Sequence, residues 1–154
     1  MLKYVDTKVT FAEVPNEISL CINISNCPCA CKGCHSSYLA EDVGKELNSL
    51  SLKELISNNK GITCVSFMGG DSSPSKIDAL AQWVKINYPI KIAWYSGRQE
   101  LSKDINLNNF NFIKLGPYIE DLGPLNSKTT NQRFYKIEEN KLVDITNLFW
   151  KDND

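Results

Sequence analysis

Long apolar runs and an excess of charge of one sign are both missing from this sequence. No stretch of the 154 residues approaches the roughly 20 consecutive apolar residues that a membrane-spanning helix needs. Residues 1–6 lack the apolar segment of a secretory signal peptide. The 17 Lys and Arg residues are balanced by 18 Asp and Glu residues, which leaves no basic excess for nucleic acid or an anionic membrane. We therefore expect a cytoplasmic protein that binds neither.

Internal repeats, low-complexity segments and linkers are also missing, which argues against a solenoid or a chain of linked domains. The hydrophobic content of 42% and the charged content of 23% are ordinary for a globular protein. A chain of this length can bury one core. We therefore predict a single domain over residues 1–154.

Cysteine, in contrast, is concentrated, because four of the six cysteines lie within residues 27–34. Cys27, Cys31 and Cys34 have the spacing C-x3-C-x2-C. Thiolates this close together can converge on one soft metal centre, whereas such short gaps strain most disulfides. Iron–sulfur clusters are normally held by four cysteine thiolates. Three ligands from one loop would leave one iron of a four-iron cluster open to another ligand, as in catalytic metal sites.

Two other interpretations of this motif stay open. A structural zinc site could use Cys27, Cys29, Cys31 and Cys34, although overlapping C-x-C pairs fit poorly to the usual C-x2–4-C spacing. A disulfide framework would require an oxidising compartment. Of the three, the residues favour the open iron–sulfur cluster. Cys29 could exchange with Cys27 or Cys31 as a ligand.

The hydrophobic pattern alternates between strands and helices. Periodicity and turn residues predict strands at 3–14, 17–24, 62–67, 90–95 and 111–115, helices from about Ser51, at 74–88 and near 98–103, and a hairpin of 133–137 with 142–145. A capping box of Ser51 and Glu54 is expected to begin the first helix. Cys21 and Cys64 lie inside strands and are expected in the core. Alternating strands and helices predict an α/β fold with a mainly parallel sheet.

Four further stretches make the sequence similar to a known family. They are residues 67–71 (Phe-Met-Gly-Gly-Asp), 94–97 (Trp-Tyr-Ser-Gly), 116–122 (Gly-Pro-Tyr-Ile-Glu-Asp-Leu) and 130–133 (Thr-Asn-Gln-Arg). With the cysteine motif, they resemble the radical S-adenosylmethionine superfamily. The last two resemble its subfamily of activating enzymes for anaerobic ribonucleoside-triphosphate reductase. The resemblance runs from about residue 16 to about residue 137.

The resemblance implies a single radical S-adenosylmethionine domain, folded as a small incomplete, open α/β barrel with the cluster loop at the C-terminal end of the strands. Cys27, Cys31 and Cys34 would hold a 4Fe-4S cluster whose open iron binds S-adenosyl-L-methionine. The implied enzyme is an oxidoreductase. It receives an electron from a donor such as a flavodoxin or ferredoxin, cleaves S-adenosyl-L-methionine to a 5′-deoxyadenosyl radical, and generates a glycyl radical on the reductase. No side chain is assigned as a catalytic acid or base.

The resemblance also suggests which residues bind S-adenosyl-L-methionine. They are Gly33, His35, Gly69, Gly70, Asp71, Ser96 and Lys114. Glycines allow a backbone to approach a ligand closely, and a carboxylate at a strand end can receive an ammonium group. On the residues alone, an ordinary strand-to-helix turn is the favoured explanation of Gly69, Gly70 and Asp71, and it is their position after the cysteine motif, at the interval seen in the family, that favours a ligand contact. The chain departs from the family at Ser72, where proline is usual, and at Leu115, where an acid is common.

Three other functions remain alternatives. The chain could activate another glycyl-radical enzyme of the pyruvate formate-lyase type. It could instead act on a small molecule such as a pterin. In a different class, it could be a zinc-binding module without catalysis.

Overall fold

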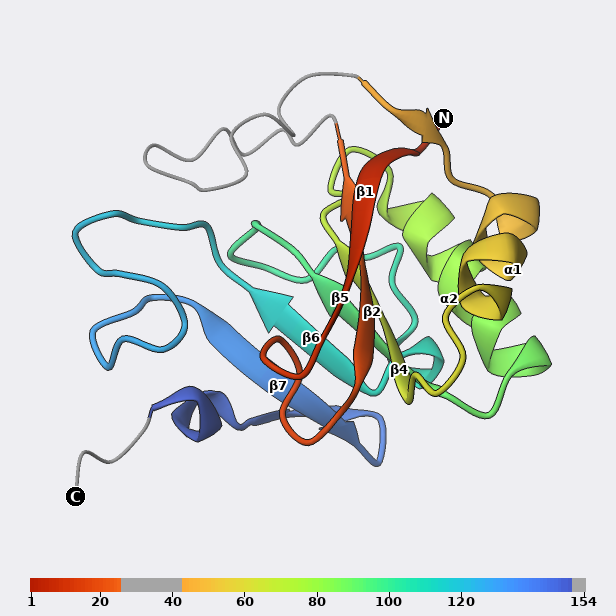
Figure 1. Ribbon diagram of the computed structural model, residues 1–154. Coiled ribbons are helices and arrows are strands. Elements are labelled where there is room, and N and C mark those ends of the chain that lie inside the picture. The colour runs from red at the N-terminus through yellow and green to blue at the C-terminus, as the bar shows by residue number, and fades with distance from the viewer. Residues whose placement is uncertain (26–42, 151–154) are drawn as a thin grey trace.

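The computed structural model describes residues 1–25 and 43–150 (Figure 1). The cysteine motif, with Gly33 and His35, lies outside the described residues. Within these ranges the chain forms one eight-stranded sheet and two α-helices. The strands are β1 Lys3–Thr10, β2 Ser19–Ile24, β3 Lys45–Glu46, β4 Cys64–Met68, β5 Lys91–Tyr95, β6 Phe112–Leu115, β7 Arg133–Glu138 and β8 Lys141–Asp144. The helices are α1 Ser49–Ser57 and α2 Pro74–Asn87, with short 3-10 turns η2 Leu107–Asn109 and η3 Thr146–Phe149.

The sheet is mixed, with the order β3-β1-β2-β4-β5-β6-β7-β8. The four central strands, β2, β4, β5 and β6, are parallel neighbours. The remaining four pairings, β1 with β2, β1 with β3, β6 with β7 and β7 with β8, are antiparallel. The α/β class is therefore confirmed. The expectation of a mainly parallel sheet is wrong, because only three of the seven pairings are parallel.

The physical reason for the antiparallel flanks is the kind of connection between the strands. Parallel neighbours need a crossover, usually through a helix, and α2 provides one between β4 and β5. No α-helix intervenes between β1 and β2 in the described chain, or between β6 and β7. The predicted hairpin of β7 and β8 is confirmed. Its two turn residues, Glu139 and Asn140, have positive φ values of 49° and 59°, as a tight two-residue hairpin turn requires.

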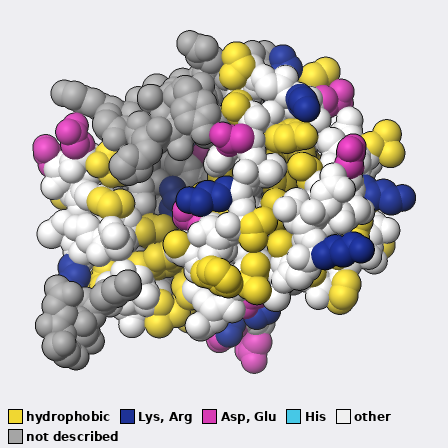
Figure 2. Space-filling model, viewed as in Figure 1, with side chains coloured by type: hydrophobic (Ala, Val, Ile, Leu, Met, Phe, Trp, Pro, Cys, Tyr) yellow, Lys and Arg dark blue, Asp and Glu magenta, His cyan; other side chains and the backbone are white. Residues whose placement is uncertain are grey.

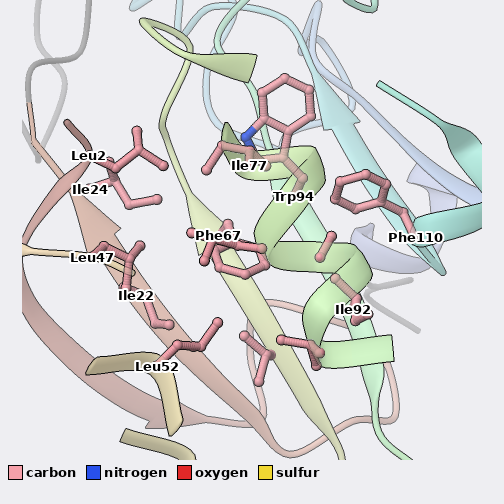
Figure 3. Packing of buried hydrophobic residues seen from close by; sticks show 14 of the residues in the cluster. Leu2, Ile22, Ile24, Leu47, Leu52, Phe67, Ile77, Ile92, Trp94 and Phe110 are labelled. Carbon is pink, nitrogen blue, oxygen red and sulfur yellow. The ribbon is translucent and has the colours of Figure 1, made fainter. Parts of the chain in front are cut away.

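The main core lies between the sheet and the two helices (Figure 3). On β2, alternate residues Leu20, Ile22 and Ile24 are fully buried and face this core. Phe67 of β4 and Trp94 of β5 are its largest buried side chains. From the helix side, the expected helix at 74–88 is confirmed as α2, and its buried residues are Ile77, Leu80, Ala81 and Val84. Burial of such side chains is the main term that holds the helices on the sheet, at about 1.5–3 kcal/mol for each large one.

A smaller core covers the opposite face of the sheet. It contains Cys64, Tyr95 and Phe134, together with Val14 from the loop that follows β1. Cys21, on β2, is also buried, at 4% exposure. The prediction that Cys21 and Cys64 are core residues is confirmed.

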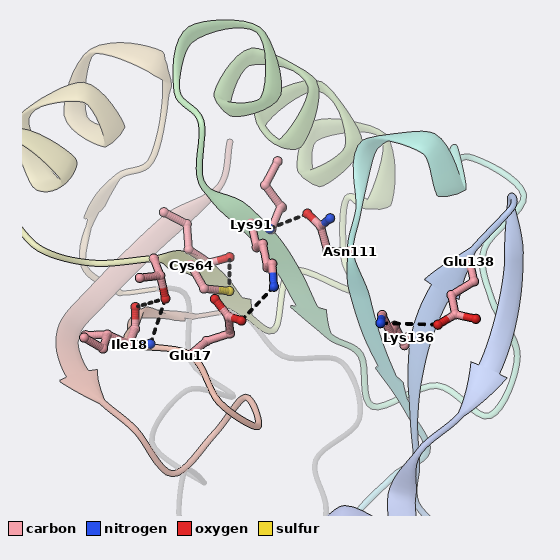
Figure 4. Close-up of polar contacts among 10 residues, drawn as sticks. Glu17, Ile18, Cys64, Lys91, Asn111, Lys136 and Glu138 are labelled. Carbon is pink, nitrogen blue, oxygen red and sulfur yellow. Dashed lines mark hydrogen bonds and ion pairs between the residues drawn. The ribbon is translucent and has the colours of Figure 1, made fainter.

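Polar contacts fasten the end of the sheet where the parallel strands begin (Figure 4). The Glu17 carboxylate pairs with the Lys91 ammonium at 2.8 Å, which ties the start of β2 to the start of β5. The Ile18 amide donates to the Thr63 hydroxyl at 2.9 Å. The loops after β2, β4, β5 and β6 lie at the opposite end of the sheet, where these parallel strands finish.

Two local predictions are wrong. Helix α1 begins two residues earlier than expected, because Asn48 caps it: its side chain accepts from the Ser51 amide, and the Ser51 hydroxyl accepts from the Asn48 amide. Asn is at least as good a cap as Ser, and it stood one turn upstream of the residue predicted. Residues 98–103 form bends and turns in place of the expected helix. In the described part of the chain, no helix is both long and apolar enough to cross a membrane.

Candidate cofactor site at the carboxyl ends of the parallel strands

The candidate site lies where the four parallel strands end. Strand β2 ends at Ile24, so the chain passes from this edge of the sheet directly into the segment that carries the cysteine motif. Gly69 follows β4, Ser96 follows β5 and Gly116 follows β6. In open α/β sheets, ligands bind in the crevice outside the carboxyl ends of the strands. The predicted residues that the structure describes therefore share the edge from which the cysteine motif departs.

Asp71 and Ser96, both predicted from the sequence, are in direct contact. One carboxylate oxygen of Asp71 accepts from the Ser96 hydroxyl at 2.5 Å, and the other accepts from the Gly97 amide at 2.8 Å. Asp71 is only 5% exposed, and hydrogen bonds to an ionised acceptor are stronger than neutral ones. The Ser96 hydroxyl also accepts from the Arg98 amide at 3.1 Å. Asp71 thus fixes the turn after β5 against the turn after β4.

Lys114 links the turns after β5 and β6. It is buried, at 8% exposure, and its ammonium donates to the carbonyl oxygens of Ser96 at 2.9 Å and Gly116 at 3.0 Å. The same ammonium lies 5.7 Å from the centre of the Tyr95 ring, within cation–π range. Lys114 therefore places a buried positive charge at this edge, beside the backbone of Ser96. Its expected contact with a carboxylate of S-adenosyl-L-methionine stays a prediction.

Gly69 and Gly70 are required by the turn itself. Both have φ in the left-handed region, +109° and +92°. A Cβ on Gly70 would lie 2.5 Å from Cδ1 of Ile77, and a Cβ on Gly69 would lie 3.2 Å from the carbonyl oxygen of Ile24. The Trp94 indole N–H also donates to the Gly69 carbonyl at 2.6 Å. The strand-to-helix turn is thus sufficient to explain both glycines, and their contact with a ligand remains a prediction.

An open pocket adjoins this edge on the side of α2. Its volume is about 560 Å³, and its lining includes Asp71, Trp94, Ser96, Arg98 and Lys103. Two of the predicted binding residues, Asp71 and Ser96, thus line a pocket that residues 98–103 also line. The sequence did not single out Arg98 or Lys103, because the segment lacks any motif and reads as a short helix.

The segment that carries the cysteine motif is fixed to the first strand at both flanks. The Ser25 amide donates to the Lys3 carbonyl at 2.9 Å, and the Leu47 amide donates to the Leu2 carbonyl at 2.8 Å. Adjacent residues of the chain thus hold the entrance and the exit of this segment. Sequence patterns do not reveal this arrangement, because it depends on long-range strand pairing.

The two cysteines outside the motif are unsuited to bind a metal. Burial raises the pKa of the Cys21 thiol from its ordinary value of 9.0 to about 12, and burial raises the pKa of Cys64 to about 12 as well. Metal ligands are thiolates, so a thiol kept protonated at neutral pH is a poor donor. Among the six cysteines, those of the motif are therefore the better candidates for the thiolate ligands of an iron–sulfur cluster.

Two stretches of the resemblance, 116–122 and 130–133, meet in the structure. The Asn131 side-chain amide donates to the Pro117 carbonyl at 3.1 Å, and a Cβ on Gly116 would lie 3.1 Å from the Cα of Gln132. Arg133 lies 3.8 Å from Asp144 and over the Trp150 ring at 6.0 Å. Asn131, whose role no sequence pattern indicates, thus ties the residues before β7 to the turn after β6.

Comparison with protein families gives a match over most of the chain. The model of the 4Fe-4S single cluster domain matches residues 18–138. The chain belongs to this 4Fe-4S family. The matched residues of the 4Fe-4S domain contain the whole cysteine motif and extend from β2 through β7. Searches of curated proteins and of solved structures each gave no match.

Family membership decides between the interpretations of the motif. A 4Fe-4S domain needs cysteine thiolates, and Cys27, Cys31 and Cys34 lie within the matched residues. The 4Fe-4S cluster is therefore the supported cofactor, ahead of zinc or disulfides. The identity of the three ligands, and the predicted roles of Gly33 and His35, concern residues outside the described ranges and stay predictions.

Proposed function

We propose that this chain is a radical S-adenosylmethionine activating enzyme that generates a glycyl radical on anaerobic ribonucleoside-triphosphate reductase. One observation carries the proposal. A 4Fe-4S domain has the spacing C-x3-C-x2-C in the sequence soon after β2, a strand that ends at the carboxyl edge of the parallel strands. Three thiolates for four irons leave one metal position for a non-protein ligand. The family resemblance supports S-adenosyl-L-methionine as that ligand.

The described residues have the chemistry to receive this cofactor. Bound together, the cluster and S-adenosyl-L-methionine supply reductive cleavage of the sulfonium carbon–sulfur bond, which yields methionine and a 5′-deoxyadenosyl radical. Asp71 and Ser96 hold the turns after β4 and β5 in place, so that backbone groups there keep a fixed orientation. Lys114 adds a positive charge near the position proposed for the methionine carboxylate. The protein thus orients the cofactor and limits competing reactions.

The substrate is proposed to be a protein. The described chain has one sheet and two α-helices, which is little material for a separate substrate domain or lid. A glycine-containing loop of a partner would approach the carboxyl ends of the parallel strands, and its Cα hydrogen would pass to the 5′-deoxyadenosyl radical. The electron would come from a flavodoxin or ferredoxin.

The test has two stages, both under anaerobic conditions. The reconstituted chain should contain iron and sulfide in comparable amounts and should cleave S-adenosyl-L-methionine when given a strong reductant. Cys27→Ala, Cys31→Ala and Cys34→Ala should each abolish cleavage, whereas Cys64→Ala, a matched control in the core, should retain it. Retained cleavage in any of the first three variants would refute that ligand.

The second stage identifies the substrate. Mixed with the candidate reductase, reductant and S-adenosyl-L-methionine, the chain should give a glycyl-radical doublet in electron paramagnetic resonance. Cleavage without a doublet would point to a different glycyl-radical enzyme or a small-molecule substrate. A colourless protein that holds stoichiometric zinc after reconstitution would overturn the proposal.

A further inference from the structure

A segment of buried polar residues precedes β7. Thr130 is 4% exposed and Gln132 is 7% exposed, and the Gln132 backbone amide donates to the Thr130 hydroxyl at 3.0 Å. Strands β6 and β7 lie side by side (Figure 1) and are paired at Leu115 and Arg133. A Cβ on Gly116 would lie 3.1 Å from the Gln132 Cα. The segment therefore packs against the turn after β6, at the carboxyl edge of the parallel strands.

Two neighbouring side-chain amides of this segment lack the hydrogen bonds that burial demands. The Asn131 Nδ2 donates to the Pro117 carbonyl at 3.1 Å, but its Oδ1 is buried without a partner in the described part of the chain. The side-chain amide of Gln132 makes no hydrogen bond with a described residue either. A buried polar group without a partner costs about 1–3 kcal/mol, and most such groups in folded proteins are satisfied. This cost in the free chain indicates a ligand that supplies the missing partners.

The other buried side-chain atom without a partner has a local explanation. Ser19 Oγ belongs to the first residue of β2, at the opposite end of the sheet. Ser19 pairs across the sheet with Cys64 of β4, and a hydroxyl can rotate toward the thiol of its neighbour. The two amides before β7, in contrast, lie at the edge where the candidate cofactor site is.

Gln132 shares its face and its edge of the sheet with Lys114. The Gly116 carbonyl, next to Gln132, accepts from the Lys114 ammonium at 3.0 Å. By the alternation of side chains along β7, Gln132 falls on the face of Phe134, which packs against Tyr95 in the smaller core. Lys114 lies on this face too, because its ammonium is 5.7 Å from the centre of the Tyr95 ring. This is the face of the sheet opposite the helices.

The proposed reaction limits how a substrate loop can be held. Glycine has no side chain, so the groups closest to its Cα that can be recognised are backbone N–H and C=O groups. Among the described atoms on the face viewed in Figure 2, acidic and basic side chains are scattered, and no large area of one sign is present to attract a charged loop. A side-chain amide has an acceptor oxygen and two N–H donors, which match the N–H and C=O of a peptide group.

We propose that the side-chain amide of Gln132 binds the backbone of the substrate loop, at a peptide group next to the reacting glycine. The inference rests on the proposed function and adds to it the residue that recognises the substrate. Oε1 of Gln132 accepts from a peptide N–H, and Nε2 donates to a peptide carbonyl. Asn131 is anchored on Pro117, and its Oδ1 is a second acceptor for the same backbone.

The experiment measures binding of a short blocked peptide, centred on the reductase glycine, to the full reconstituted chain with S-adenosyl-L-methionine under anaerobic conditions. Fluorescence polarisation of the labelled peptide gives the dissociation constant. Gln132→Met keeps the length of the side chain but removes its polar groups, so the peptide should bind about tenfold more weakly. Gln82→Met makes the same change at an exposed position of α2 and should bind the peptide like the wild type.

Two further measurements separate recognition from a structural role. Gln132→Met replaces a buried, unpaired amide with an apolar group, so its urea midpoint should equal or exceed that of the wild type. The backbone N–H groups of the peptide are then methylated one at a time. Methylation at the position that Gln132 contacts should weaken binding to the wild type and have little further effect on Gln132→Met, as expected for two groups that interact directly.

Cleavage of S-adenosyl-L-methionine by the wild type, without peptide, tests the proposed function separately. Cleavage without peptide binding would overturn this inference together with the choice of a protein substrate. Cleavage and peptide binding, with an unchanged affinity in Gln132→Met, would overturn this inference alone. A urea midpoint of Gln132→Met below that of the wild type, or methylation effects that are the same in both chains, would also overturn it.

Discussion

At the scale of single residues, the site is organised by side chains that bond to backbone. Asp71 receives the Gly97 amide as well as the Ser96 hydroxyl, and Lys114 donates to two carbonyl oxygens. These side chains hold turns in place before any ligand binds. Such preorganisation would lower the conformational cost of binding, because the groups proposed to face the ligand are already ordered.

Asp71→Asn should destabilise the chain by about 1–3 kcal/mol. The side-chain amide has one acceptor oxygen in place of two and carries no charge, so it cannot accept from both the Ser96 hydroxyl and the Gly97 amide as strongly as the carboxylate does. Urea unfolding measures the loss. Asp78→Asn is the matched control: Asp78 also accepts from a backbone amide, that of Asn106 at 2.8 Å, but it is more exposed. A loss at Asp78 as large as that at Asp71 would contradict the role of burial.

The raised pKa values of Cys21 and Cys64 predict slow alkylation at pH 8 in the folded chain. A shift from 9.0 to about 12 lowers the thiolate fraction on the order of 1000-fold. Peptide mapping by mass spectrometry, with the urea-unfolded chain as reference, gives the rate at each cysteine. Rates in the folded chain equal to those in urea would show that burial does not protect these thiols.

The same shifts give a pH dependence of stability. The folded chain holds these two thiols protonated over a pH range in which the unfolded chain ionises them. The contribution of the thiols to stability is therefore complete below pH 9 and is lost as the pH rises from 9 toward about 12. Urea midpoints measured between pH 8 and 10 should fall, and the double variant Cys21→Ala/Cys64→Ala should show a smaller fall.

At the scale of elements, the sequence predicts the central strands and α2 well, since these depend on local periodicity. The stripe of Ile77, Leu80, Ala81 and Val84 on α2 and the burial of alternate residues on β2 follow directly from spacing. The start of α1 does not follow from the sequence, because two capping residues, Asn48 and Ser51, compete within one turn. The helix expected at 98–103 is missing from the described structure. Two hydrogen bonds hold that segment instead: the Arg98 amide donates to the Ser96 hydroxyl, and the Gly116 amide donates to the Arg98 carbonyl. No local sequence pattern reveals these contacts.

Gly70→Ala tests the turn between β4 and α2. The substitution combines an unfavourable φ of +92° with a Cβ 2.5 Å from Cδ1 of Ile77, so we expect a loss of about 2–4 kcal/mol in unfolding free energy. Gly61→Ala is a close control, because its φ is +90° and no atom lies within 4 Å of the added Cβ. It should cost about 1 kcal/mol. Equal losses in urea unfolding would mean that packing against α2 contributes nothing.

At the scale of the whole molecule, the α/β class and the meeting of Asp71, Ser96 and Lys114 at one edge were predictable. Residues that follow parallel strands must share the carboxyl edge of the sheet. The mixed pairing was not predictable from periodicity, since β1, β7 and β8 have the same strand pattern in either direction. Pairing direction depends on the connections, and the long connection from β6 to β7 contains no α-helix among its described residues to carry a parallel crossover.

Deletion of residues 1–3 should lower the iron content after reconstitution more than it lowers secondary structure, because it removes both carbonyl acceptors, on Leu2 and Lys3, that hold the flanks of the cysteine segment. Iron analysis and circular dichroism on the same sample measure the two effects. Deletion of residues 151–154 is the control and should leave iron content unchanged. Full iron content in the N-terminal deletion would contradict this dependence.

The attachment of Ser25 and Leu47 to consecutive residues near the start of the chain has a practical consequence for handling the protein. Anything joined to Met1, such as an affinity tag, begins one residue before the Leu2 carbonyl that accepts from the Leu47 amide, close to both flanks of the cysteine segment. A tag at the opposite terminus is the safer choice for purification. Metal loading that changes when an N-terminal tag is cleaved would then report on these flanking contacts and not on the cysteines themselves.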